Sequence, residues 1–88
     1  MTFEGAVIKE QGITFAVVVV RRSTLNNPTQ REEVAESFAR QAFGGLPVVL
    51  MAQDGRGTPT YWGRQDLARF LSGVPLEAIP WKRYTIAA

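Results

Sequence analysis

The residue types that most often carry enzyme chemistry are absent from this sequence or stand alone in it. Its 88 residues include no histidine and no cysteine. The chain therefore has no thiolate nucleophile, no disulfide, no zinc ligand of the imidazole or sulfur type and no histidine general base. Ser23, Ser37 and Ser72 have no histidine to activate them, and no nucleophile–base pair can be assembled. We expect a non-enzymatic protein without a cofactor.

The acidic residues and glycines do not form a recognisable ligand site. Glu32, Glu33 and Glu36 have helical spacing but fall on the expected solvent side of a helix, so no metal site is expected. Gly55-x-Gly57 lacks the further glycine and the Lys-Ser/Thr pair of a phosphate loop, and Asp54-Gly55 is typical of a hairpin turn.

Arginine and aromatic residues gather in two stretches, 53–66 and 80–84, which contain both tryptophans and both tyrosines. The candidate binding residues drawn from them are Arg56, Tyr61, Trp62, Arg64, Trp81, Arg83 and Tyr84. Three interpretations stay open. The rings are core residues with polar tips, or the set is a protein interface rich in hot-spot residue types, or it binds single-stranded nucleic acid by stacking and phosphate contacts.

The surrounding pattern predicts one α/β (α+β) domain over residues 1–88. Strands are expected at 3–10, 13–21, 47–52, 60–62 and 81–86, with helices at about 28–43 and 64–72. The order ββαββαβ, with one helix crossing between two apolar strands, favours a single mixed sheet of about five strands. The segment 74–80 has room for one helical turn.

Several local signals refine these elements. The strand at 13–21 is apolar on both sides, which indicates a central strand or a strand facing a partner. Asn27 followed by Pro28 is a helix start, and Thr29 is the alternative cap. Arg31 is expected to face water. Gly44-Gly45 and Gly73 are expected to end the two helices.

Two helices cannot cover both faces of a five-stranded sheet thoroughly. If both helices pack on one face, the other face stays apolar and becomes an interface. This leads to the hypothesis of a homodimer through that face or through an edge strand.

Residues 46–73 resemble the second half of a thioredoxin-like domain. The shared features are the proline opening a buried strand (Leu46-Pro47), the glycine-containing hairpin (Asp54-Gly55), the return strand, Gly63 and a closing helix. The first half departs from that pattern and lacks the Cys-x-x-Cys motif, so the resemblance implies a layout but no redox activity. It leaves open whether the Leu46–Pro47 bond is cis.

Charge and hydropathy complete the expectations. The net charge is +2, with ten basic and eight acidic residues. The first residues lack the basic start of a signal peptide, and the longest apolar run, 15–20, is too short for a membrane helix. We expect a cytoplasmic, soluble module that binds itself or a protein partner and not a membrane. The alternative is a nucleic-acid binder.

Overall fold

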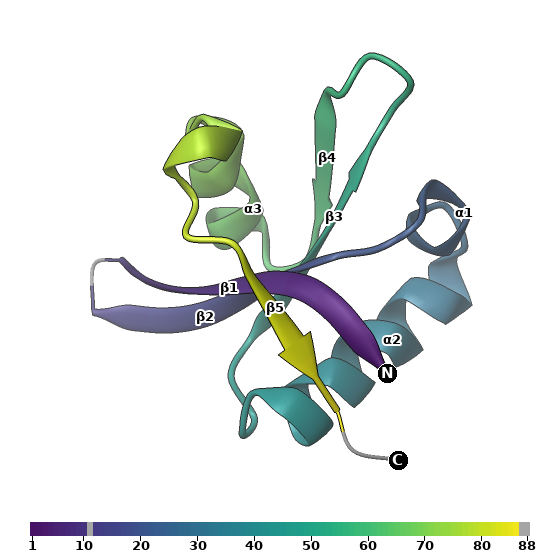
Figure 1. Cartoon of the computed structure of the whole chain (residues 1–88), viewed down its shortest axis with the longest axis vertical. Coiled ribbons are helices and arrows are strands. Elements are labelled where there is room, and N and C mark those ends of the chain that lie inside the picture. Colours follow the sequence, from purple (N-terminus) through teal and green to yellow (C-terminus); the bar gives the residue numbers. More distant parts are fainter. Residues whose placement is uncertain (11, 87–88) are drawn as a thin grey trace.

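The computed structural model describes residues 1–10 and 12–86, which form one mixed five-stranded sheet in the order β4-β3-β2-β1-β5 (Figure 1). Its strands are β1 (Thr2–Glu10), β2 (Ile13–Val19), β3 (Val48–Gln53), β4 (Pro59–Trp62) and β5 (Lys82–Thr85). Its helices are α1 (Arg22–Leu25), α2 (Pro28–Ala42), α3 (Gln65–Ser72) and the 3-10 turn η1 (Leu76–Ala78). The predicted fold class and strand order along the chain are confirmed. The four-residue α1, too short to show an apolar period, was not predicted.

β2 is a central strand, which explains why its sequence is apolar on both sides. It pairs antiparallel with β1 (Gly5 with Val18) and parallel with β3 (Val18 with Leu50). Residues 15–18 have no exposed surface. The strand ends at Val19, two residues earlier than predicted, because the chain turns into α1 at Arg22. The predicted turn at Gln11-Gly12 includes Gln11, which lies outside the described residues.

The caps of α2 follow the sequence signals. The Asn27 side chain accepts a hydrogen bond from the Gln30 N–H (2.9 Å), so Asn27 and not Thr29 is the cap. Gly44 has a φ of 61° at the other end, a left-handed conformation that glycine adopts without strain. The second helix ends differently, since Gly73 has a φ of −94° and is not a left-handed cap.

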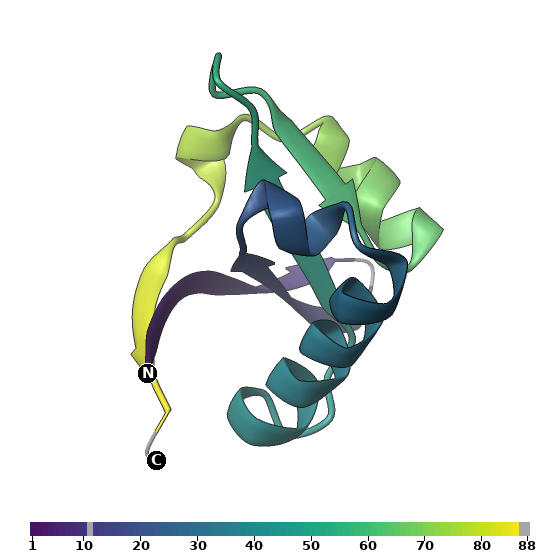
Figure 2. The same cartoon turned by 90° about the vertical axis from the view of Figure 1, so that its right-hand side faces the viewer.

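Each face of the sheet has its own hydrophobic core. On the first face, α1 and α2 contribute Leu25 and Phe38 to a cluster with Phe3 and Leu50. On the second face, α3 contributes Leu67 and Leu71 to a cluster with Phe15 and Met51, so that the helices flank the sheet (Figure 2). The helices thus pack on opposite faces of the sheet. The dimer through an uncovered face was predicted for the case that both helices pack on one face, and that case does not apply.

β1 changes partner at Gly5, and this opens one end of the sheet. It pairs with β2 from Gly5 onward and with β5 over Thr2–Gly5, as the curved ribbon of β1 shows (Figure 1). A Cβ on Gly5 would lie 2.8 Å from the Val17 carbonyl oxygen, so the two strands approach too closely for any larger residue. The rings of Phe3 and Tyr84 cover this position. The residues before Gly5 pair with β5 and not with β2, so the carboxyl ends of β2 and β3 lie uncovered on one side.

Segment 46–73 contains the strand, hairpin, return strand and helix that were predicted. The Asp54 carboxylate closes the hairpin by accepting hydrogen bonds from the Thr58 and Arg56 N–H groups (3.0 and 2.8 Å), which lower the pKa of Asp54. The Leu46–Pro47 peptide bond is trans. No helix among the described residues is long and apolar enough to cross a membrane.

Candidate functional site

The seven predicted binding residues do not share one surface. Trp62 and Tyr84 pack on the core of the α2 face, whereas Tyr61 and Trp81 pack on the core of the α3 face. The strand period of two explains the division between Tyr61 and Trp62, because neighbouring strand residues point to opposite faces. All four rings are half-buried. The structure therefore divides the four aromatic residues of the candidate set between the two faces of the sheet.

The two rings on the α2 face are engaged within the molecule. Tyr84 stacks on Phe3 with 5.3 Å between ring centroids. The Arg31 guanidinium lies 5.0 Å from the Trp62 ring centroid and also donates to the Leu25 carbonyl oxygen (3.3 Å). Arg31 was predicted to face water; instead its long side chain folds back over an apolar ring and is part-buried.

The three arginines of the predicted set are exposed but do not converge. Arg56 lies at the tip of the β3–β4 hairpin, and Arg83 lies opposite Glu4 in the β1–β5 pair. Arg64 precedes α3 and makes a two-pronged contact with Asp66 (3.1 and 2.7 Å). This contact raises the pKa of Arg64 and lowers that of Asp66. The positive charges are thus distributed around the molecule.

The open end of the sheet contains a hollow of about 330 Å³ on the α3 face. We call it the α3-face hollow; it is lined by Glu4, Val19, Met51, Gln53, Leu76, Glu77 and Trp81. Trp81 is the one predicted site residue in it. The Trp81 indole N–H already donates to the Leu76 carbonyl oxygen (3.0 Å), so the ring is held in place and presents an apolar surface.

The α3-face hollow has apolar walls and negatively charged side chains. Met51 is almost fully buried at its base, while Glu4 and Glu77 are exposed. Within residues 1–10 and 12–86 the only ion pair is Arg64–Asp66, so neither glutamate forms one, although Arg83 lies opposite Glu4 across the β1–β5 pair. The Gln53 amide donates to the Gly57 carbonyl oxygen. This combination of groups suits a ligand that is apolar along its length and positively charged at its end.

Sequence reasoning did not single out Glu4 or Met51. A signal for Glu4 was present, because it alternates with Phe3 and shares the face of Ala6, one of the residues of the α3-face core. What the sequence does not reveal is the change of partner at Gly5, which places Glu4 beside the carboxyl ends of β2 and β3.

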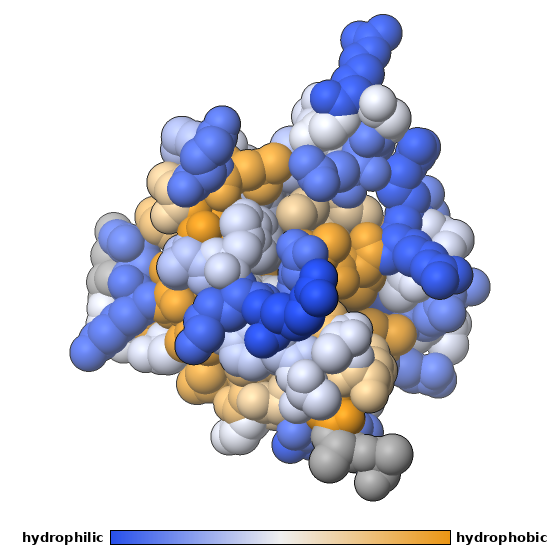
Figure 3. Space-filling view, viewed as in Figure 1, coloured by the Kyte–Doolittle hydropathy of each residue, from blue (hydrophilic) through white to orange (hydrophobic). Residues whose placement is uncertain are grey.

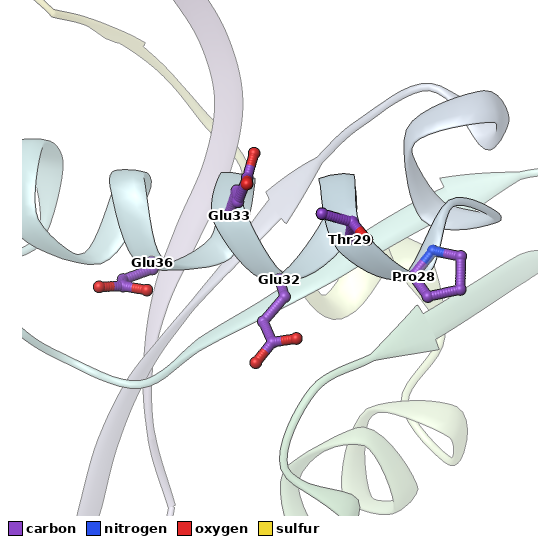
Figure 4. A pocket seen from close by; sticks show the side chains of 5 residues that line it. All are labelled: Pro28, Thr29, Glu32, Glu33 and Glu36. Atoms are coloured by element: carbon purple, nitrogen blue, oxygen red, sulfur yellow. The ribbon is translucent and has the colours of Figure 1, made fainter.

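The glutamates of α2 form a second acidic region without the geometry of a metal site. Glu32, Glu33 and Glu36 leave the helix in different directions beside Pro28 and Thr29 (Figure 4). In the part of the chain that the structure describes, no group of three acidic residues is arranged to hold a metal ion.

Tyr61 offers a test of how the α3 face is packed. Its hydroxyl oxygen is buried without a hydrogen-bond partner, and burial raises the pKa of the phenol. Because a buried unpaired hydroxyl is costly, we expect Tyr61→Phe to raise the free energy of unfolding by about 1 kcal/mol. Urea unfolding followed by tryptophan fluorescence measures this, and a loss of stability would show that the hydroxyl is satisfied in solution.

Comparison with protein-family models, with curated proteins and with solved structures finds no match to this chain. The thioredoxin-like resemblance of residues 46–73 therefore stays a prediction, and the functional proposal rests on the residues of the site.

Proposed function

We propose that this chain is a non-enzymatic binding module that holds a protein partner through one basic side chain inserted into the α3-face hollow. The observation that carries the proposal is the pairing of a fixed, half-buried Trp81 ring with two exposed glutamates, Glu4 and Glu77, around one hollow. Of the three interpretations that the sequence leaves open, this observation favours the protein interface, with Trp81 as its anchor.

The chemistry of the hollow matches each part of an arginine or lysine side chain. The aliphatic stem can lie along Val19, Met51 and Leu76, which are apolar. The cationic group can then reach the face of the Trp81 ring and the carboxylates of Glu4 and Glu77. A partner that presents an acidic residue at the same place would be repelled, so the site discriminates by charge.

The arrangement of the other predicted residues disfavours nucleic acid. Tyr84 is stacked on Phe3, and Trp62 lies beneath the Arg31 guanidinium. The faces of these two rings are therefore not open for stacking with bases. In addition, the glutamates beside Trp81 would repel a phosphate backbone. Nucleic-acid binding is therefore the alternative, which the titration with an oligonucleotide tests.

The test is an amide NMR titration of the labelled protein with two model peptides, acetyl-Ala-Arg-Ala-amide and its glutamine counterpart. We expect saturable shifts at the Trp81 indole N–H and at Met51 with the arginine peptide and none with the glutamine peptide. The double variant Glu4→Gln/Glu77→Gln should bind the arginine peptide about fivefold more weakly, since exposed ion pairs contribute modestly. Glu33→Gln, exposed on the opposite side at α2, is the matched control and should change nothing.

Three outcomes would overturn the proposal. Equal shifts with both peptides would show that binding in the hollow does not depend on the positive charge. An unchanged affinity in the double glutamine variant would remove the glutamates from the site. Strong, salt-sensitive shifts at Arg56, Arg64 and Arg83 with a ten-residue oligothymidine, without a response to the arginine peptide, would establish the nucleic-acid alternative.

A dilution series of the unbound protein tests whether the partner is a second copy. Arg56 is exposed at the hairpin tip and is the kind of side chain that the hollow is proposed to take. Concentration-dependent shifts at Trp81 that disappear in Arg56→Gln would identify a second copy as the partner. Shifts that do not change on dilution would leave the partner as a different protein.

A further inference from the structure

We infer that the opposite side of the open sheet end binds a small organic anion with a linear apolar body. Two adjoining hollows lie there, of about 460 and 130 Å³, between the start of β1 and helices α1 and α2. Met1, Val34 and Phe38 line both, so the two form one trough, which we call the α2-face trough. The trough lies on the other face of the sheet from the α3-face hollow, and Val19 borders both.

The long wall of the trough is apolar. Phe3 and Phe38 are buried core residues whose edges reach it, and Val20 and Val34 are half-buried beside them. Figure 3 shows this as hydrophobic surface beside the N-terminal end of β1, next to hydrophilic side chains over α1. Along α2 the trough runs from Val34 to Gln41, about 10 Å of helix axis, which gives room for an extended alkyl chain.

Both ends of the trough are polar. At one end lie Arg21, which is exposed, and the hydroxyl-bearing Thr24. Arg21 has no ion-pair partner within residues 1–10 and 12–86. At the far end lie Ser37 and Gln41, which are hydrogen-bonded to each other (3.1 Å), and the Met1 ammonium group, which donates to the Ile86 carbonyl oxygen (3.2 Å). A ligand with an anionic end and an apolar body can therefore place its anionic group beside Arg21 and its body along the apolar wall.

The position of Arg21 follows from the fold. Arg21 comes directly after Val20, whose N–H donates to the Met51 carbonyl oxygen at the carboxyl end of the parallel β2–β3 pair. After Val20 the chain leaves the sheet towards α1 and α2 on the first face. Arg21 is therefore placed at the carboxyl end of the β2–β3 pair, at the edge of the trough.

The experiment titrates the labelled protein with octanoate and follows the amide signals of Val20, Thr24 and Val34 by NMR. Octanol and octylamine are the neutral and cationic controls. We expect octanoate alone to give saturable shifts, with an affinity that rises from butanoate to octanoate by up to about fourfold per carbon.

Two variants separate the anion site from simple apolar binding. Arg21→Gln should weaken octanoate about fivefold or more, since an arginine–carboxylate contact is lost. Arg69→Gln removes the same charge from an exposed position on α3, on the other face of the sheet, and should leave the affinity unchanged. Equal binding of octanol, no response to Arg21→Gln, or no saturable shift at millimolar octanoate would each overturn the inference.

Discussion

Replacing Phe3 by alanine is expected to lower the free energy of unfolding by about 3–5 kcal/mol, a large part of what holds a small domain folded. Phe3 is 8% exposed and its ring contacts those of Phe38, Phe43 and Tyr84, with centroids 4.6, 6.0 and 5.3 Å away. The substitution would leave a cavity at the place where β1 meets β5 and α2. Chemical denaturation monitored by circular dichroism gives the value directly.

Val7→Ala is the matched control for this prediction. Val7 lies on the same strand and the same face as Phe3, but it is 42% exposed. Its truncation should therefore cost less than about 1 kcal/mol. Similar losses in both variants would show that the aromatic cluster does not hold the start of β1 in place.

Gly5→Ala is expected to destabilise the protein by about 2–3 kcal/mol because the added methyl group has nowhere to go. The nearest atom to the new Cβ, at 2.8 Å, is a backbone oxygen, that of Val17, and moving it would disturb the β1–β2 pairing. The measurement is again the unfolding free energy, together with NMR shifts of Glu4 and Tyr84 that report a displaced β1.

Gly55→Ala gives the comparison for that effect. No heavy atom lies within 4 Å of a Cβ built on Gly55, which has no left-handed backbone conformation. The alanine there should be nearly neutral. If Gly5→Ala were as mild as Gly55→Ala, the close approach of β1 to β2 would not exist in solution.

The elements of this fold could be predicted because their signals are local. Asn27-Pro28 and Gly44-Gly45 mark the ends of α2 through backbone conformations that these residues favour. The apolar pattern of β2 on both sides predicts a central strand, and that is its place. Pro59 on a short strand predicts a sheet edge, which β4 is.

The candidate sites could not be predicted, because they depend on long-range packing. Local periodicity does not show which face of the sheet each helix covers. In the structure Trp62 packs on the α2 face and Trp81 on the α3 face. It also does not reveal that Arg31 folds over Trp62 instead of extending into water. The only sign of the change of partner in the sequence is a glycine, Gly5, inside a predicted strand.

The pairing of β1 with β5 also bears on how the protein assembles. These strands join opposite ends of the chain, Thr2 with Thr85, whereas the β1–β2 hairpin and the β3–β4 hairpin are local. Closing so long a loop is entropically costly, so we expect β5 to be the strand that joins last and detaches most readily. The α3-face hollow uses Glu4 and Trp81, and the α2-face trough uses Phe3 and Ile86. Both sites are therefore complete only when the two ends of the chain are paired, and a molecule bound at either site would stabilise that pairing.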